Sequence, residues 1–212
     1  MPHKLPRGLY ALLDDSVRPE LPMIQKARAV FAAGVGVLQL RLEQTPDRAA
    51  LTIVREVVAE ARSALVIVND RVDLVLASGA HGVHLGADDL PIDVARKLLG
   101  PDALIGATTR SLQQIEQAKE QGADHVGLGP IFTTSTKVVA AAPLGVEAFG
   151  TIARQSPLPV VGIAGITLDT IGQVAAAGAW CAAVAGDLLR SEDPVSRARA
   201  LQEAFFRSSH EA

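Results

Sequence analysis

Eight short apolar runs alternate with longer segments of helical period along this chain, and this alternation restricts the fold more than any other feature. The apolar runs, which we interpret as strands, are Gly8–Leu13, Val37–Arg41, Leu65–Asn69, Gly82–Leu85, Ala103–Ala107, Asp124–Gly129, Val160–Ile163 and Ala182–Ala185. The helical segments are Pro22–Ala33, Pro46–Ala61, Arg71–Ala77, Pro91–Leu99, Ser111–Gln121, Val146–Arg154, Thr167–Ala177 and Pro194–Phe206. Eight strand–helix units predict a parallel sheet closed into a TIM (β/α)8 barrel. An open doubly wound sheet is the competing fold, but it usually has fewer strands.

Length and composition fit one such barrel. The chain has 212 residues, 49% of them apolar, and we see no segment typical of an interdomain linker, so we predict one domain over residues 1–212. The formal charge of −3 offers no broad basic face and argues against nucleic-acid binding. Any anionic ligand must therefore be held by a few well-placed donors.

The sequence also indicates the cellular compartment in which the protein is expected. The single cysteine, Cys181, lies in an apolar run, and we expect its side chain to pack in the core. We find no secretion signal and no run of about 20 apolar residues that would span a membrane. We therefore expect a cytoplasmic protein; its oligomeric state stays open.

A weak repeat marks alternate predicted strands. Each copy begins with a glycine where a helix ends and then enters a strand: Gly79–Gly86, Gly122–Gly129, Gly178–Ala185 and, more loosely, Gly34–Arg41. Because strand side chains alternate between faces, the last inward positions are Arg41, Gly86, Gly129 and Ala185, and those one layer below are Gln39, His84, Gly127 and Ala183. One long cation thus faces three very small residues, which predicts a ligand cavity at the carboxyl end of the barrel.

Polar loops follow several of these strands. After Gly129-Pro130 the chain carries a run of hydroxyls closed by Lys137, a combination suited to gripping phosphate, although an ordinary polar loop would look similar. Thr108 follows another strand with the parity of Gly106 and could face the ligand. Residues 162–167 and 185–187 follow the last two strands, where barrels commonly bind a terminal phosphate.

Two carboxylates follow neighbouring strands. Asp70 and Asp89 can converge above the barrel rim, and two carboxylates with ligand oxygens and waters suit Mg²⁺. Taken singly, Asp70 could cap a helix and Asp89 could occupy a turn.

We interpret His84 as a hydrogen-bonded core histidine, and we place His81 and His125 away from the rim. No histidine pairs with a serine or cysteine nucleophile, so covalent catalysis is not expected.

Together these motifs resemble thiamine phosphate synthase, in order and spacing, over roughly residues 8–207. The matching segments are Gln39–Arg41, Val68–Asp70, Gly82–Gly86 with Asp89, Gly127–Phe132, Thr134–Lys137, Pro143–Gly145 and Gly162–Ile166. The resemblance implies a TIM barrel that joins hydroxymethylpyrimidine pyrophosphate to thiazole phosphate, giving thiamine phosphate and pyrophosphate by Mg²⁺-assisted dissociative substitution.

The resemblance also implies roles for individual residues. Those that would bind pyrophosphate and support the reaction are Arg41, Asn69, Thr108 and Lys137, with Gln39 beside them in the substrate site. Asp70 and Asp89 would hold Mg²⁺. The residues that would bind the thiazole phosphate are Thr134, Thr136, Gly165, Val184, Ala185 and Gly186.

The chain departs from the family pattern at several positions. Glu43 replaces a usual lysine, and Asp187 replaces a small apolar residue, so each could place negative charge near an expected anion or could point to the surface. Ala164, Gly186 and Thr133 replace a usual glycine, serine and proline.

Two other functions stay open. Related thiazole tautomerases share the fold, but they lack the paired aspartates and carry a histidine in place of Pro130. A non-catalytic binder of thiamine precursors is the third possibility, motivated by Glu43 and Asp187.

Overall fold

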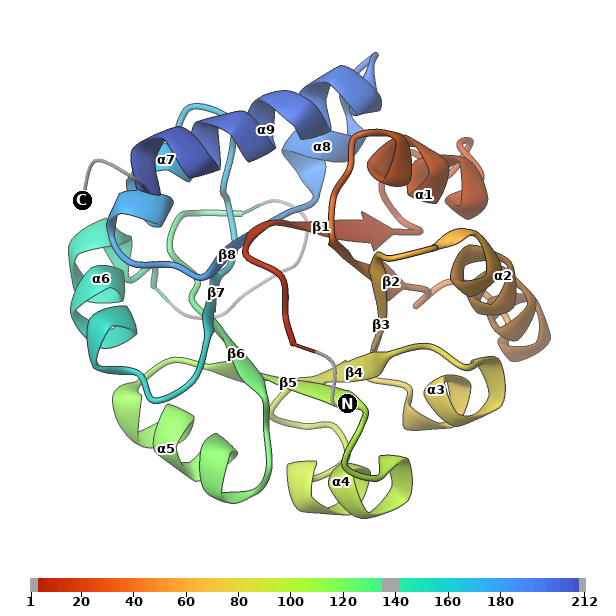
Figure 1. The fold of residues 1–212 in the computed structure, drawn as a ribbon, viewed down its shortest axis with the longest axis horizontal. Coiled ribbons are helices and arrows are strands. Elements are labelled where there is room, and N and C mark those ends of the chain that lie inside the picture. The colour runs from red at the N-terminus through yellow and green to blue at the C-terminus, as the bar shows by residue number, and fades with distance from the viewer. Residues whose placement is uncertain (1–3, 135–141, 210–212) are drawn as a thin grey trace.

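Eight parallel strands form a closed barrel in the order β1 to β8 (Figure 1). The computed structural model describes residues 4–134 and 142–209. The strands are β1 Gly8–Asp14, β2 Val37–Arg41, β3 Leu65–Asn69, β4 Gly82–Leu85, β5 Leu104–Thr109, β6 His125–Leu128, β7 Val160–Gly162 and β8 Cys181–Val184. β8 pairs with β1, which closes the sheet and confirms the predicted TIM barrel.

Helices surround the barrel on its outside (Figure 1). They are α1 Met23–Ala32, α2 Asp47–Glu60, α3 Val72–Ser78, α4 Ile92–Leu99, α5 Leu112–Glu120, α6 Gly145–Gln155, α7 Ile171–Ala176, α8 Gly186–Leu189 and α9 Pro194–Ser209. The short α8, directly after β8, was not predicted from the sequence.

Several predicted boundaries were wrong by a few residues, most notably those of β5 and α7. β5 does not end at Ala107, because Thr108 and Thr109 continue its pairing with Gly127 and Leu128 of β6. Thr167 does not open α7; the helix starts at Ile171, and the Thr167 backbone N–H instead donates to Oγ1 of Thr170 in the preceding turn. Ser111, the first residue of the predicted helical segment, is the N-cap of α5, and its Oγ accepts from the Gln114 backbone N–H at 3.3 Å.

The strands separate two apolar layers, as their alternation predicts. One layer packs against the helices and includes Leu38, Val68, Val126 and Val184. The other fills the barrel and includes Tyr10, Leu12, Ile67, Leu104 and Val161. Gln39, His84 and His125 are also buried. The interior is therefore a packed core that becomes polar toward one end.

The opposite end of the barrel is covered by the segment before β1. Leu5 belongs to the interior apolar layer, and its carbonyl accepts from Nε1 of Trp180 at 2.9 Å. Sγ of Cys181 donates to the Pro6 carbonyl at 3.0 Å, and burial raises the pKa of the Cys181 thiol to about 12. This thiol is thus a core group, as the sequence indicated, and it stays protonated at neutral pH.

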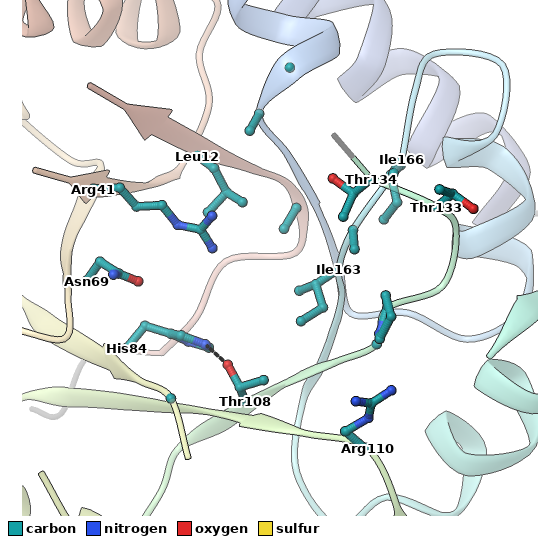
Figure 2. A pocket seen from close by; sticks show the side chains of 18 of the residues that line it. Leu12, Arg41, Asn69, His84, Thr108, Arg110, Thr133, Thr134, Ile163 and Ile166 are labelled. Carbon is teal, nitrogen blue, oxygen red and sulfur yellow. Dashed lines mark hydrogen bonds between the residues drawn. The ribbon is translucent and has the colours of Figure 1, made fainter. Parts of the chain in front are cut away.

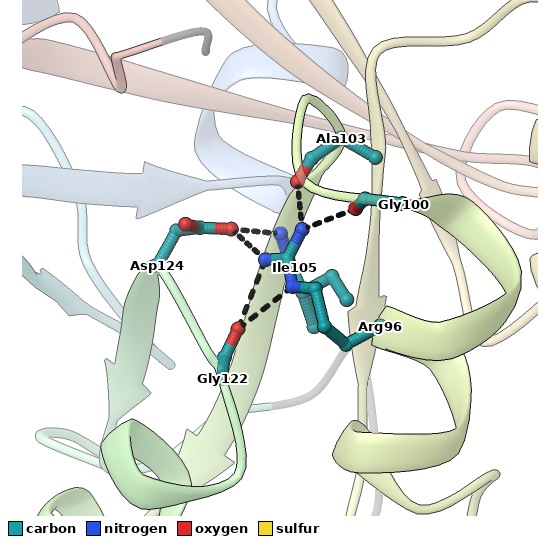
Figure 3. Close-up of polar contacts among 6 residues, drawn as sticks. All are labelled: Arg96, Gly100, Ala103, Ile105, Gly122 and Asp124. Atoms are coloured by element: carbon teal, nitrogen blue, oxygen red, sulfur yellow. Dashed lines mark hydrogen bonds and ion pairs between the residues drawn. The ribbon is translucent and has the colours of Figure 1, made fainter.

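Arg96 joins α4 to the starts of β5 and β6 (Figure 3). Its guanidinium donates to the carbonyls of Gly100, Ala103 and Gly122, and it also pairs with Asp124. The Asp124 carboxylate accepts from the Ile105 backbone N–H as well, at 2.7 Å. One side chain therefore satisfies several loop carbonyls at the amino ends of two strands.

No helix in the described parts of the chain is long and apolar enough to cross a membrane.

Candidate functional site

A cavity of about 550 Å³ lies over the carboxyl ends of the strands. Its walls come from residues of β1 to β8 and from the loops that follow several of these strands; β1 contributes Leu12. The four rim positions deduced from the sequence repeat, Arg41, Gly86, Gly129 and Ala185, all line it. The predicted hollow at this end of the barrel is therefore confirmed, and Arg41 points into it (Figure 2).

Most of the predicted site residues meet in this cavity. Those that line it are Arg41, Asn69, Asp70, Asp89, Thr108, Thr134, Gly165, Ala185 and Gly186. Gln39 and Val184 are not among the lining residues: Gln39 lies below the cavity and Val184 packs outward against the helices. Val184 can reach a ligand only through its backbone. Thr136 and Lys137 lie outside the described residues.

Arg41 is supported from below by a chain of hydrogen bonds. Its Nε donates to Oε1 of Gln39 at 3.1 Å, and Nε2 of Gln39 donates to the Tyr10 hydroxyl at 3.1 Å. Burial raises the pKa of Tyr10 well above its usual value, so the phenol stays protonated. Among the described residues, the Arg41 side chain donates only from Nε, so its two terminal nitrogens are available to an anion in the cavity.

The paired carboxylates are fixed by local hydrogen bonds. Oδ2 of Asp70 accepts from Nδ2 of Asn69 at 2.6 Å, and Oδ2 of Asp89 accepts from the Gly86 backbone N–H at 2.6 Å. Asp70 has a left-handed backbone with φ of 62°, a conformation that Asp tolerates better than most residues. These contacts turn both carboxylates toward the cavity that they line.

Asp70 and Asp89 are the carboxylates that were predicted to bind a metal ion. Within the described parts of the chain, no group of three or more His, Cys, Asp or Glu side chains is arranged to hold a metal ion. Asp70 and Asp89 therefore do not form a complete cage. Two carboxylates in an open cavity fit Mg²⁺, which commonly combines one or two protein carboxylates with substrate phosphate oxygens and waters.

Thr108 reaches the cavity from β5 beside His84 of β4. Nε2 of His84 lies 3.0 Å from Oγ1 of Thr108 (Figure 2), which confirms that this histidine is hydrogen-bonded. His125 is fully buried below them, and burial lowers its pKa to about 4. His125 was correctly placed away from the rim, and it stays neutral at physiological pH.

The loops after β6 and β7 are held together on the other side of the cavity. The Ile131 backbone N–H donates to the Ile163 carbonyl at 3.0 Å, and the Phe132 backbone N–H donates to the Ala164 carbonyl at 3.2 Å. Ala164 and Gly165 both have left-handed backbones, with φ of 73° and 68°. Glycine adopts this conformation at low cost, so Ala164 introduces some strain into the loop.

The two acidic residues that depart from the family pattern, Glu43 and Asp187, differ in their position relative to the cavity. Glu43 is exposed and is not among the residues that line the cavity. Asp187 does line it, at the start of α8. Oδ2 of Asp187 accepts from the Leu168 backbone N–H at 3.3 Å and lies 3.8 Å from Nη1 of Arg197. Arg197 thus partly offsets the negative charge that Asp187 brings to this wall.

Three further charged side chains line the cavity wall: Asp88, which directly precedes Asp89, and Arg110 and Arg190, which were not predicted from the sequence. Arg110 lies two residues after Thr108 and therefore faces the same side of the chain, which could have identified it as a cavity residue. It was missed because the predicted strand ended at Ala107. Arg190 follows α8, which was not predicted.

Comparisons with known proteins point to one family. A family model described as Thiamine monophosphate synthase matches residues 9–188. The chain is 53% identical over 206 residues to the thiamine-phosphate synthase of Myxococcus xanthus (strain DK1622), covering 96% of this chain and 94% of that protein. It is 48% identical over 199 residues to the thiamine-phosphate synthase of Anaeromyxobacter dehalogenans (strain 2CP-C), covering 93% and 87%. The solved thiamine phosphate pyrophosphorylase of Pyrococcus furiosus matches with a TM-score of 0.87 and 31% identity, covering 95% of this chain and 96% of that one.

Proposed function

The chain belongs to the thiamine monophosphate synthase family of enzymes, and from this premise we propose that it joins hydroxymethylpyrimidine pyrophosphate to thiazole phosphate with Mg²⁺. The products are thiamine phosphate and pyrophosphate. One observation carries the proposal: Arg41, Asp70, Asp89 and Thr108, which come from four successive strands and the loops after them, line one cavity.

The cavity has two parts suited to two phosphorylated substrates. Arg41, Asn69 and Thr108 lie on the β2–β5 side, where they would bind the pyrophosphate group. Gly165 and Gly186 lie on the β7–β8 side, where bare backbone amides would bind the single phosphate. Thr134 comes from the loop after β6, which packs on the loop after β7, and it would bind the same single phosphate.

The proposed reaction needs no protein nucleophile. The bond between the exocyclic carbon of the pyrimidine and the pyrophosphate oxygen breaks, and pyrophosphate leaves with the electron pair. The thiazole nitrogen then donates its lone pair to the resulting cation. Arg41 and Thr108 would stabilise the charge on the leaving group, and the two phosphate sites would align the partners.

Asp70 and Asp89 would hold Mg²⁺ together with pyrophosphate oxygens and waters. When bound there, the ion neutralises part of the negative charge on the leaving group. Lys137, which lies outside the described residues, would contribute a further cation from the loop after β6.

Synthase activity is tested by incubating the protein with both substrates and Mg²⁺ and following the products by phosphorus NMR. We expect thiamine phosphate and pyrophosphate to form in equal amounts. Isomerisation of the thiazole without Mg²⁺ would favour the tautomerase function instead. Saturable binding without turnover would favour the non-catalytic binder.

Two substitutions test the site assignment. Asp70→Ala and Lys137→Ala should each abolish most turnover while the circular dichroism spectrum stays unchanged. Asp102→Ala and Lys119→Ala remove the same kinds of charge from exposed positions and serve as matched controls. Near-normal rates in both site variants would contradict the assignment.

A further inference from the structure

Arg110 extends the wall that Thr108 begins. It directly follows Thr109, the last residue of β5, and its side chain lines the cavity. The Arg110 backbone N–H donates to Oε1 of Gln114 at 2.7 Å, which ties the start of this loop to α5. Figure 2 shows Arg41 and Arg110 on opposite sides of the cavity, with Thr108 on the wall between them.

The Arg110 guanidinium has no protein partner among residues 4–134 and 142–209, where neither a hydrogen bond nor an ion pair engages it. Other arginines of this chain behave differently: Arg71 pairs with Asp47 and Asp73, and Arg28 pairs with Glu60. A half-buried guanidinium at a cavity wall leaves five N–H donors for a ligand.

Among the described residues on this side of the cavity, the charges favour an anionic ligand only when Arg110 is counted. Asp70, Asp88 and Asp89 bring three negative charges to the β3–β4 loops, against which Arg41 alone brings one positive charge. Arg110 raises the cationic total to two. With a divalent cation bound at the carboxylates, the side becomes net positive, as a pyrophosphate group requires.

The position of Arg110 around the barrel indicates which of the two substrate phosphate groups it could bind. β5 lies between β4, which carries Asp89 in its loop, and β6. The glycine loops proposed for the single phosphate follow β7 and β8, two and three strands further around the barrel. Arg110 also lies two residues after Thr108, which we place on the pyrophosphate, and so faces the same side of the chain where β5 ends. A planar guanidinium matches phosphate oxygens with two parallel hydrogen bonds.

We propose that Arg110 binds the pyrophosphate group of the pyrimidine substrate, opposite Arg41. This inference rests on the proposed function for the identity of the substrate. It assigns a second guanidinium to the leaving group, so that the departing charge is held from two sides of the cavity.

The test compares Arg110→Gln and Arg110→Lys with the wild-type protein. Arg207→Gln, which removes the same charge from an exposed position on α9, is the control. Titration calorimetry with pyrophosphate in excess Mg²⁺ measures binding without turnover. We expect about tenfold weaker binding in Arg110→Gln, an intermediate loss in Arg110→Lys, and wild-type affinity in the control.

Steady-state kinetics provides the second measurement. In Arg110→Gln, the KM for the pyrimidine pyrophosphate should rise about tenfold, while the KM for the thiazole phosphate stays within about twofold. Equal pyrophosphate affinity in Arg110→Gln and wild type would overturn this inference and leave the proposed function standing. Pyrophosphate binding that depends on Arg110, in a wild-type protein without synthase turnover, would support the binding role and contradict the proposed function.

Discussion

Nε2 of His84 lies 3.0 Å from Oγ1 of Thr108, and both side chains line the cavity. If His84 carries its proton on Nε2, the Thr108 hydroxyl accepts that hydrogen bond and directs its own hydrogen toward a ligand. His84 would then act as a positioning residue for Thr108, and the loss of either side chain should remove the same interaction.

A double-mutant cycle checks this coupling. Thr108→Val and His84→Leu should each lower kcat/KM by about tenfold, and the double variant should be little worse than either alone. His84→Gln, whose amide can donate a hydrogen bond, should recover part of the loss. Independent, multiplying effects would show that His84 does not act through Thr108.

Asp187 should weaken the binding of the thiazole phosphate. Its carboxylate lines the cavity beside the glycine loops, and Arg197 at 3.8 Å only partly offsets it. Asp187→Asn should therefore lower the KM for the thiazole phosphate by about fivefold, equivalent to about 1 kcal/mol. Glu43→Gln is the matched control, since Glu43 is exposed and outside the cavity wall. An unchanged or higher KM in Asp187→Asn would contradict this account.

His125 should make the fold sensitive to acid. Burial lowers its pKa from 6.5 to about 4, so the unfolded chain takes up this proton first as the pH falls. The stability is fully present above pH 6.5 and is lost progressively as the pH falls toward 4. At pH 5 the loss should be about 2 kcal/mol.

Urea unfolding at pH 7.5 and pH 5 measures this effect. The free energy of unfolding should fall between the two conditions by about 2 kcal/mol more in the wild type than in His125→Leu. Other groups titrate equally in both proteins, so the difference isolates His125. An equal fall in both would refute the assignment.

Arg96 should stabilise the amino-terminal end of the barrel. Arg96→Ala leaves the carbonyls of Ala103 and Gly122 without this donor and removes the partner of Asp124, so we expect a loss of about 3 kcal/mol in the free energy of unfolding. Lys97→Ala, in the same helix, breaks only an exposed pair with Asp93 and should cost much less. Both variants should keep wild-type KM values, because Arg96 lies at the end of the barrel opposite the cavity. A loss in Arg96→Ala no larger than in Lys97→Ala would contradict this role.

The barrel could be predicted because its pattern is local. The bounds of β2, β3 and β4 agree with the predicted strands, and strand parity alone placed Arg41 opposite Gly86 and Gly129 at the rim. The small residues at these positions identified the end of the barrel that holds the cavity, because a barrel built only for packing would place larger side chains there.

What could not be predicted depends on contacts between distant segments. Arg197 of α9 reaches Asp187 at the start of α8, and no periodicity in the sequence links those two positions. The direction of Glu43 depends on the path of the loop after β2, which strand parity does not describe. Arg110 was missed because pairing with β6 extends β5 beyond the residue at which its apolar pattern ends.

The central claim is that Arg41, Thr108, Asp70 and Asp89 surround one pyrophosphate–metal group. Diffraction from crystals soaked with pyrophosphate and Mn²⁺ tests it most directly, because anomalous scattering locates the metal. The account predicts pyrophosphate between Arg41 and Thr108, with the metal bound by Asp70 and Asp89. Metal bound away from these two carboxylates, or pyrophosphate outside this cavity, would contradict it.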